Sequence, residues 1–270
     1  EKIGMEELEE GIERVMAGPE RRSRLISDKE KKIIAYHEVG HAIVAKVLPD
    51  SDPVHKISII PRGHAALGYT LQLPEEDRFL RSRSDLLNRI AILLSGRVAE
   101  ELVFGDVTSG AANDLERSTQ TARQMVTELG MSERLGLVKL GNKHEEIFLG
   151  RDISEERNYS EEIAYAIDQE VKAIIDSCYD KARAILEEHR ELMDRIAGIL
   201  LEREVLDRSE FDVLMEGGEL PPRSAKKAED SKPAADGDAK APDGAPEKGE
   251  DLPPLPENRV DGLPKDGLLG

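Results

Sequence analysis

The chain has 270 residues, enough for one sizeable domain or two small ones. Its formal net charge of −18 at pH 7 argues against a nucleic-acid-binding surface, so we expect no nucleic-acid partner. The single cysteine, Cys178, excludes an internal disulfide, and no run of residues approaches the ~18 apolar positions that a transmembrane helix needs.

Residues 1–25 are charged and carry Met5, Leu8, Ile12 and Val15 at helical spacing, which predicts a short amphipathic helix. No Gly-x-x-x-x-Gly-Lys-Ser/Thr loop occurs anywhere in the sequence. The chain therefore lacks the usual phosphate-binding loop, and we do not expect it to hydrolyse ATP by itself.

A helix is predicted from Asp28 to Leu48. Ser27 followed by Glu30 is typical of a capping box at a helix N-terminus. The apolar residues of this segment recur at helical spacing and share one stripe with two histidines. That stripe consists of Ile34, His37, His41, Val44 and Leu48.

The central turn of this helix reads His37-Glu38-Val39-Gly40-His41. Residues four apart share a helix face, so both imidazoles can bind one metal ion, with Glu38 near it as a general base. The alternative without a metal is a pair of hydrogen-bonded core histidines. Burying two imidazoles and a carboxylate costs free energy, however, unless a partner such as a metal ion compensates their polar groups. The pattern favours a zinc-dependent peptide hydrolase.

A catalytic zinc needs a third protein ligand. A metzincin would have Gly at position 44 and His at position 47, whereas this chain has valine at both, which excludes that class. His55, His64 and downstream carboxylates remain candidates. Among these, Asp114 follows a run of small residues at the start of a predicted helix, where a carboxylate also commonly serves as a helix cap.

Two short strands are predicted after the helix that carries His37 and His41, which we call the zinc helix. They cover residues 54–61 and 67–73, and Gly63 and Gly68 mark the turn between them. An extended substrate can add to an exposed strand edge, and the candidate edge here is Gly68, Tyr69, Thr70 and Leu71, continuing into Gln72. An ordinary structural hairpin is the alternative.

Most of the remaining chain is predicted to be helical, over 84–104 and 113–129, followed by a long stripe from Ile163 to Ile185 and a further helix around Leu192–Leu200. The expected fold is mainly α with a small β-hairpin or sheet beside the zinc helix. Residues 216–270 are rich in Pro, Gly, Asp, Lys and Ala, which predicts a disordered C-terminal tail.

Three separated motifs resemble the protease domain of the FtsH family, the membrane-anchored ATP-dependent zinc metalloproteases. They are His37–Ala42, Leu94–Glu101 and Thr108–Asp114, in that order along the chain. The resemblance covers roughly residues 1–215. It implies one Zn²⁺ per chain held by His37, His41 and Asp114, with Glu100 as a partner that steadies a ligating histidine.

The resemblance also implies a domain plan and partners. Residues 1–25 would be the end of an ATPase module and its connection, and residues 26–215 the zinc metalloprotease domain. The full-length protein would form a homo-hexamer, use ATP through a missing ATPase module, and attach through a missing N-terminal anchor to the cytoplasmic face of the cell membrane. This fragment itself would be soluble.

The expected function is zinc-dependent endopeptidase action on unfolded or unfolding polypeptides, coupled in the full-length protein to an ATPase ring for protein quality control. The first alternative is a non-catalytic helical oligomerisation module with a structural or vestigial zinc site. An intact Glu38 argues against it, since a structural site needs no base. The second alternative is a metal hydrolase that acts on something other than peptides.

Overall fold

A computed structural model of the chain describes residues 26–62, 67–74, 79–141 and 158–222, with scattered positions before residue 20. The amphipathic helix predicted within residues 1–25 lies mostly outside the described residues, as do His64 and the predicted tail from residue 223 onward. The fold that follows concerns the described part.

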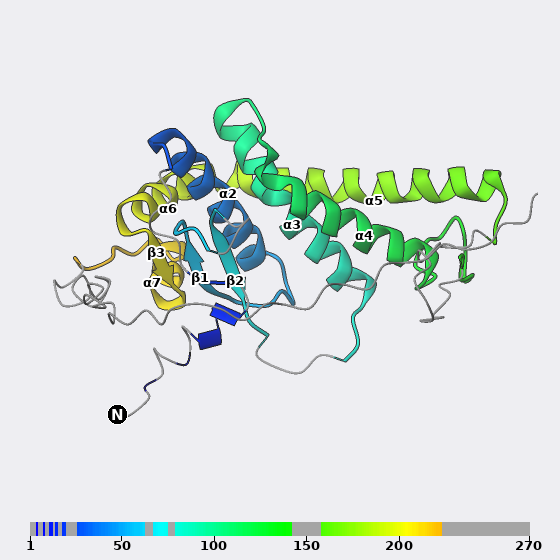
Figure 1. Ribbon diagram of the computed structural model, residues 1–270, viewed down its shortest axis with the longest axis horizontal. Helices are drawn as coiled ribbons and strands as arrows, with labels where there is room; N and C mark the ends of the chain where they lie inside the picture. The colour runs from blue at the N-terminus through cyan, green and yellow to red at the C-terminus, as the bar shows by residue number, and fades with distance from the viewer. Residues whose placement is uncertain are drawn as a thin grey trace, which may run out of the picture. The chain divides into compact units, whose positions relative to one another are not determined.

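The prediction of a mainly helical chain with a small sheet is confirmed (Figure 1). The sheet, α6 and α7 gather at one end, and the long helix α5 runs beside α3 and α4 toward the other. The elements are α2 (Asp28–Val47), β1 (Val54–Ser58), β2 (Tyr69–Gln72), α3 (Arg83–Phe104), a 3-10 turn η1 (Ser109–Ala111), α4 (Ala112–Thr127), α5 (Glu161–Glu188), α6 (Arg190–Arg203), β3 (Val205–Asp207) and α7 (Arg208–Met215).

Helix α2 begins at the predicted capping box. The Ser27 hydroxyl accepts from the Glu30 backbone N–H, and the Glu30 carboxylate accepts from the Ser27 N–H. Helix α3 begins with an equivalent box made by Ser82 and Asp85. The two helices pack closely against each other. At their contact a Cβ at Gly40 would lie 2.8 Å from the Ser95 carbonyl oxygen, so glycine permits this approach.

The sheet has three antiparallel strands in the order β2-β1-β3, which corrects the predicted two-strand hairpin. The third strand was missed because three residues are too short to show an alternating pattern. It is held by pairing with β1, where Leu206 lies opposite Ile57. The first strand also ends at Ser58 rather than at residue 61. Strand β2 lies at an edge of this sheet.

The core is built from the buried faces of the helices together with residues of β1 and β3. Its largest fully buried side chains include Phe211, Ile43, Ile90, Met193 and Ile196. Burial of such side chains supplies most of the stability of a domain of this kind.

Cys178 is part of this core, as its position on an apolar stripe predicts. Its thiol is buried, and burial raises its pKa to about 11. A thiol with so high a pKa is a packing residue rather than a nucleophile.

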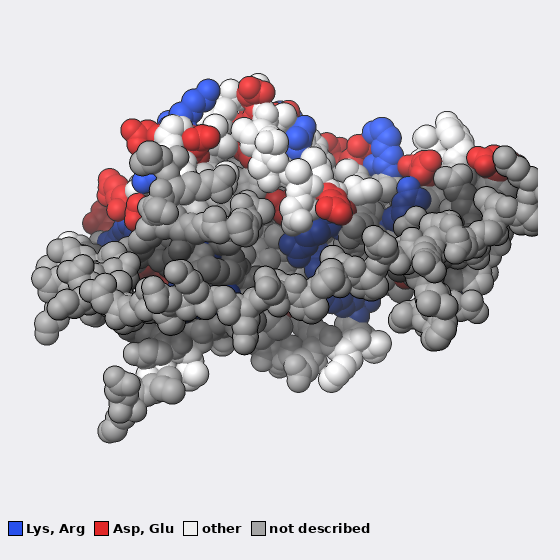
Figure 2. All heavy atoms as spheres, in the orientation of Figure 1, with Lys and Arg blue, Asp and Glu red and all other residues white. Residues whose placement is uncertain are grey.

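The described helices include none that is both long enough and apolar enough to span a bilayer. On the face shown in Figure 2, acidic and basic side chains are interspersed along the upper rim. The acidic net charge of the sequence is therefore not spread as a uniform acidic surface over the described part of this face.

Candidate metal centre

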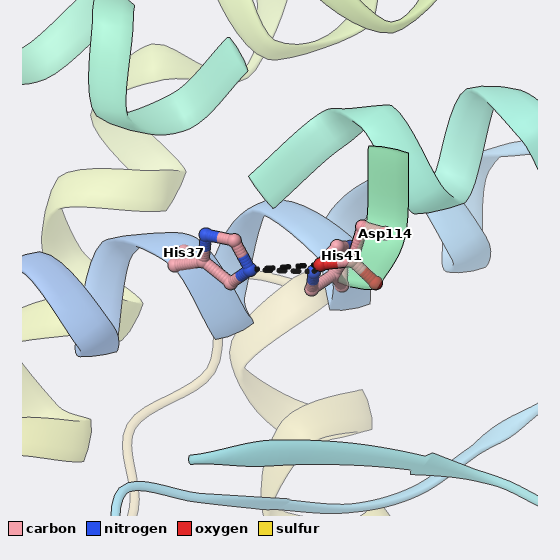
Figure 3. A group of neighbouring side chains, drawn as sticks. All are labelled: His37, His41 and Asp114. Atoms are coloured by element: carbon pink, nitrogen blue, oxygen red, sulfur yellow. Dashed lines mark hydrogen bonds and ion pairs between the residues drawn. The ribbon is translucent and has the colours of Figure 1, made fainter. Parts of the chain in front are cut away.

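Two elements bring three potential metal ligands together. His37 and His41 lie one turn apart on α2, and Asp114 lies in the first turn of α4 (Figure 3). The α4 N-cap, Ala111, makes no side-chain capping bond, and Asp114 is turned toward the histidines. The alternative that Asp114 serves only as a helix cap is therefore not favoured.

The three donor atoms form a compact triangle. Nε2 of His37 lies 3.0 Å from Nε2 of His41 and 3.3 Å from Oδ2 of Asp114, and the third side measures 3.5 Å. In the described part of the chain, no other group of three or more such side chains comes this close. His55, an open candidate from the sequence, is on β1 and is not a member of this group.

The far nitrogen of each imidazole is hydrogen-bonded. Nδ1 of His37 lies 2.7 Å from Oε1 of Glu100, and Nδ1 of His41 lies 2.7 Å from the carbonyl oxygen of Ile92. Both partners accept hydrogen bonds only, so each Nδ1 carries the proton. In the neutral imidazoles both Nε2 lone pairs consequently point into the triangle, as metal ligation requires.

Glu100 links helix α2 to the loop that leads into α4, the helix that carries Asp114. Glu100 is buried, with only 1% of its surface exposed. Its Oε1 contacts His37, and its Oε2 accepts a hydrogen bond of 2.7 Å from the Thr108 backbone N–H. Burial opposes its ionisation, but the bonds from His37 and Thr108 outweigh burial and lower its pKa. Glu100 is therefore an ionised acceptor between α2 and the start of α4.

The electrostatics of the triangle favour a cation. Burial would lower the pKa of His37, but hydrogen bonds to Asp114 and Glu100 outweigh it and raise that pKa to about 10. Burial would raise the pKa of Asp114, but its bonds to the two histidines hold it well below its usual range. Two carboxylates thus surround the imidazole pair with negative charge.

The donor set fits zinc. Two neutral imidazoles and one carboxylate are a typical catalytic zinc set, which leaves one position open. Tetrahedral zinc with ligand bonds of about 2.0–2.1 Å places its ligands about 3.3 Å apart. The separations of 3.0, 3.3 and 3.5 Å in this cluster agree with that value.

Glu38 lies beside the triangle without belonging to it. It is 6% exposed, and burial raises the pKa of its carboxyl group. The Thr70 hydroxyl, on strand β2, lies 2.8 Å from Oε2 of Glu38. A raised pKa makes a buried carboxyl group a stronger proton acceptor than an ordinary exposed one, as a general base requires.

Sequence reasoning used Ser95 and Gly96 only as part of a family motif and missed their place at the site, and it missed the contact between Thr70 and Glu38. A Cβ at Gly96 would lie 2.6 Å from Nε2 of both histidines, so glycine is required there. The available signal was a lone glycine within a predicted helix, which usually indicates close packing. The Ser95 hydroxyl donates a 2.6 Å hydrogen bond to the carbonyl oxygen of Ile92. No sequence pattern predicts that contact.

Comparison with known proteins decides the family. The model of peptidase family M41 matches residues 24–214, which is most of the chain. The chain belongs to peptidase family M41. The M41 match contains His37, Glu38, His41 and Asp114, and it confirms the resemblance to the FtsH protease domain drawn from the sequence.

Curated FtsH proteins are similar to the chain over most of its length. The chain is 58% identical over 211 residues to the ATP-dependent zinc metalloprotease FtsH of Thermotoga maritima, covering 78% of this chain and 35% of the relative. It is 53% identical over 219 residues to FtsH 1 of Thermoanaerobacter sp., covering 81% and 36% respectively. The FtsH of Rubrobacter xylanophilus is 52% identical over 216 residues, with 80% and 33% covered. The chain thus spans about a third of the length of these curated relatives.

Proposed function

We propose that this chain is a zinc-dependent endopeptidase domain. The observation that carries the proposal is the triangle of His37, His41 and Asp114 with the buried Glu38 carboxyl group beside it. A purely structural zinc site has four protein ligands and no use for such a carboxyl group. The FtsH relatives, which are named zinc metalloproteases, support the same activity.

Each residue at the site has a distinct role in the proposed reaction. Bound zinc would lower the pKa of a coordinated water molecule and polarise the peptide carbonyl. Glu38 would take a proton from the attacking water and deliver it to the leaving amine nitrogen. Glu100 and the Ile92 carbonyl would hold the imidazole rings in the orientation that leaves Nε2 free.

The substrate we propose is an extended polypeptide that adds as a strand to β2. This strand is at the sheet edge and has β1 as its neighbour. Its Thr70 side chain contacts Glu38, so a peptide lying along Tyr69, Thr70 and Leu71 would pass close to the general base. Backbone hydrogen bonds at an edge recognise any extended chain, which suits unfolded substrates.

The assembly we propose follows the resemblance to the FtsH family, and the relatives are named as ATP-dependent. In a full-length protein the domain would work in a homo-hexamer, with an ATPase module that unfolds substrates and an anchor at the cytoplasmic face of a membrane. Helices α5 and α6 are the proposed ring contacts. Sedimentation that shows only monomers at high concentration would argue against ring formation by this chain alone.

The test measures zinc per chain by elemental analysis, together with casein cleavage, on wild type, Asp114→Ala and Glu38→Gln. We expect about one zinc and cleavage in wild type, loss of both in Asp114→Ala, and zinc without cleavage in Glu38→Gln. Full zinc occupancy in Asp114→Ala would move the third ligand elsewhere. Wild-type cleavage by Glu38→Gln would overturn the mechanism, and zinc without any cleavage in wild type would favour the assembly-module alternative.

A further inference from the structure

Thr70 of strand β2 and Gly68, just before that strand, both lie next to the Glu38 carboxyl group. The Thr70 hydroxyl lies 2.8 Å from Oε2 of Glu38 and 3.0 Å from its backbone carbonyl oxygen. Two residues earlier, a Cβ at Gly68 would lie 2.9 Å from Oε1 of the same carboxyl group. Each carboxyl oxygen of Glu38 thus faces a different residue of the β2 segment.

The two carboxyl oxygens of Glu38 have different neighbours in this segment. Thr70 engages Oε2 through an O–H donor, whereas Gly68 presents no side chain to Oε1. Any residue other than glycine at position 68 would cover Oε1 and would also press on the Ser58 carbonyl oxygen, 2.9 Å from the same Cβ position. Oε2 therefore has a hydrogen-bond donor in Thr70, whereas no side chain from position 68 occupies the space next to Oε1.

We propose that Thr70 is a positioning residue for Glu38, whose hydroxyl holds Oε2 so that Oε1 receives and returns the proton during peptide hydrolysis. This inference rests on the proposed function, in which Glu38 is the general base. In this arrangement strand β2 would both bind the substrate peptide and hold Glu38, the base that acts on that peptide.

The chemistry of a hydroxyl group suits this task. The Thr70 O–H can donate to Oε2 when the carboxyl group is ionised, and again when the proton sits on Oε1. The backbone carbonyl of Glu38, 3.0 Å away, offers an alternative acceptor. Valine has nearly the shape of threonine but cannot donate, whereas serine keeps the donor and loses only a methyl group.

The experiment compares Thr70→Val and Thr70→Ser on the zinc-loaded chain with an unfolded fluorogenic peptide. We expect Thr70→Val to lower kcat about 10–100-fold, with KM changed less than about twofold and zinc content unchanged. Thr70→Ser should recover most of the rate. Thr127→Val on α4 is the matched control, because its hydroxyl bonds only the Arg123 carbonyl oxygen, away from the cluster.

A double-mutant cycle with Glu38→Ala supplies a readout that does not depend on activity. The single Thr70 hydroxyl proton can turn to the Glu38 backbone carbonyl in the Glu38→Ala background, so the cycle measures how much more the side-chain bond contributes to stability than the backbone bond. We expect Thr70→Val to lower the melting temperature more in the wild-type background than in Glu38→Ala. In the Glu38→Gln background, Thr70→Val should have no further effect on residual cleavage.

Three outcomes would overturn the positioning role: wild-type kcat in Thr70→Val, a raised KM with unchanged kcat, or equal melting shifts in the two backgrounds. The second outcome would make Thr70 a substrate-binding residue only. Failure of the proposed function has a different signature, namely wild-type cleavage by Glu38→Gln while the melting cycle still shows coupling.

Discussion

Gly96 on α3 faces His41 on α2 across the candidate metal centre so closely that a Cβ at position 96 would lie 2.6 Å from Nε2 of that histidine. The same position would lie 2.6 Å from Nε2 of His37. Real Cβ atoms do not approach ring nitrogens to this distance, so one methyl group here must displace both imidazoles. The inter-helix contact and the metal site therefore share one residue.

We expect Gly96→Ala to weaken zinc binding at least 10–100-fold, because its methyl group occupies the space of the ligand atoms. The measurement is a zinc titration against a competing chelator. Gly198→Ala on α6 is the control, since nothing lies within 4 Å of a Cβ there. That control should keep its zinc and gain about 0.4–1 kcal/mol of stability. Wild-type zinc affinity in Gly96→Ala would contradict the geometry.

Glu100→Gln should reduce zinc affinity about 10–100-fold, because a neutral amide polarises the His37 imidazole less than a carboxylate does. Glu101→Gln is the matched control at the adjacent position. Its carboxylate bonds Tyr179 and Arg183 on α5 instead of a ligand. Equal zinc affinities in the two variants would mean that Glu100 has no role in metal binding.

The stability of chelator-treated protein should depend on pH through His37 and Asp114. The folded pKa of His37 is about 10 against 6.5 unfolded, so its contribution is complete below pH 6.5 and is lost as pH rises through 10. The folded pKa of Asp114 lies below 3.8, so its contribution is present above pH 3.8 and is lost as pH falls further. Both contributions are complete only between about pH 4 and 6.5.

In that window, metal-free Asp114→Asn should be less stable than metal-free wild type by about 1.5–3 kcal/mol, the usual worth of a charge-assisted hydrogen bond. The difference should shrink by pH 9. Urea unfolding at pH 5.5 and pH 9 measures it, with the exposed loop residue Asp106 changed to Asn as control. A difference that grows with pH would show that the His37–Asp114 pair is not the source.

The isolated chain should cleave casein but not a stably folded protein of similar size, because an edge strand can accept only an extended peptide. Gel assays without ATP, with each substrate in native and denatured form, measure this. Efficient digestion of the folded form would contradict recognition at the β2 edge.

The helices of this protein could be predicted from sequence because each carries local signals. The Ser27–Glu30 box sets the start of α2, and the spacing of His37 and His41 along one turn defines the metal pair whatever the rest of the fold does. Strand β3 carries no such signal, since three residues become a strand only by pairing with β1.

The sequence by itself therefore determined the helical class and the helix that carries the proposed metal pair, His37 and His41, with the proposed general base Glu38, because these features depend on residues within one or two turns of each other. From the residues alone, Asp114 was one candidate among several, and only a family resemblance selected it. The tertiary structure decided which atoms meet over long separations: Asp114 with the histidines, Glu100 with Nδ1 of His37, and Thr70 with Glu38. Such contacts arise from the packing of α3, α4 and β2 around α2, and no local pattern encodes them.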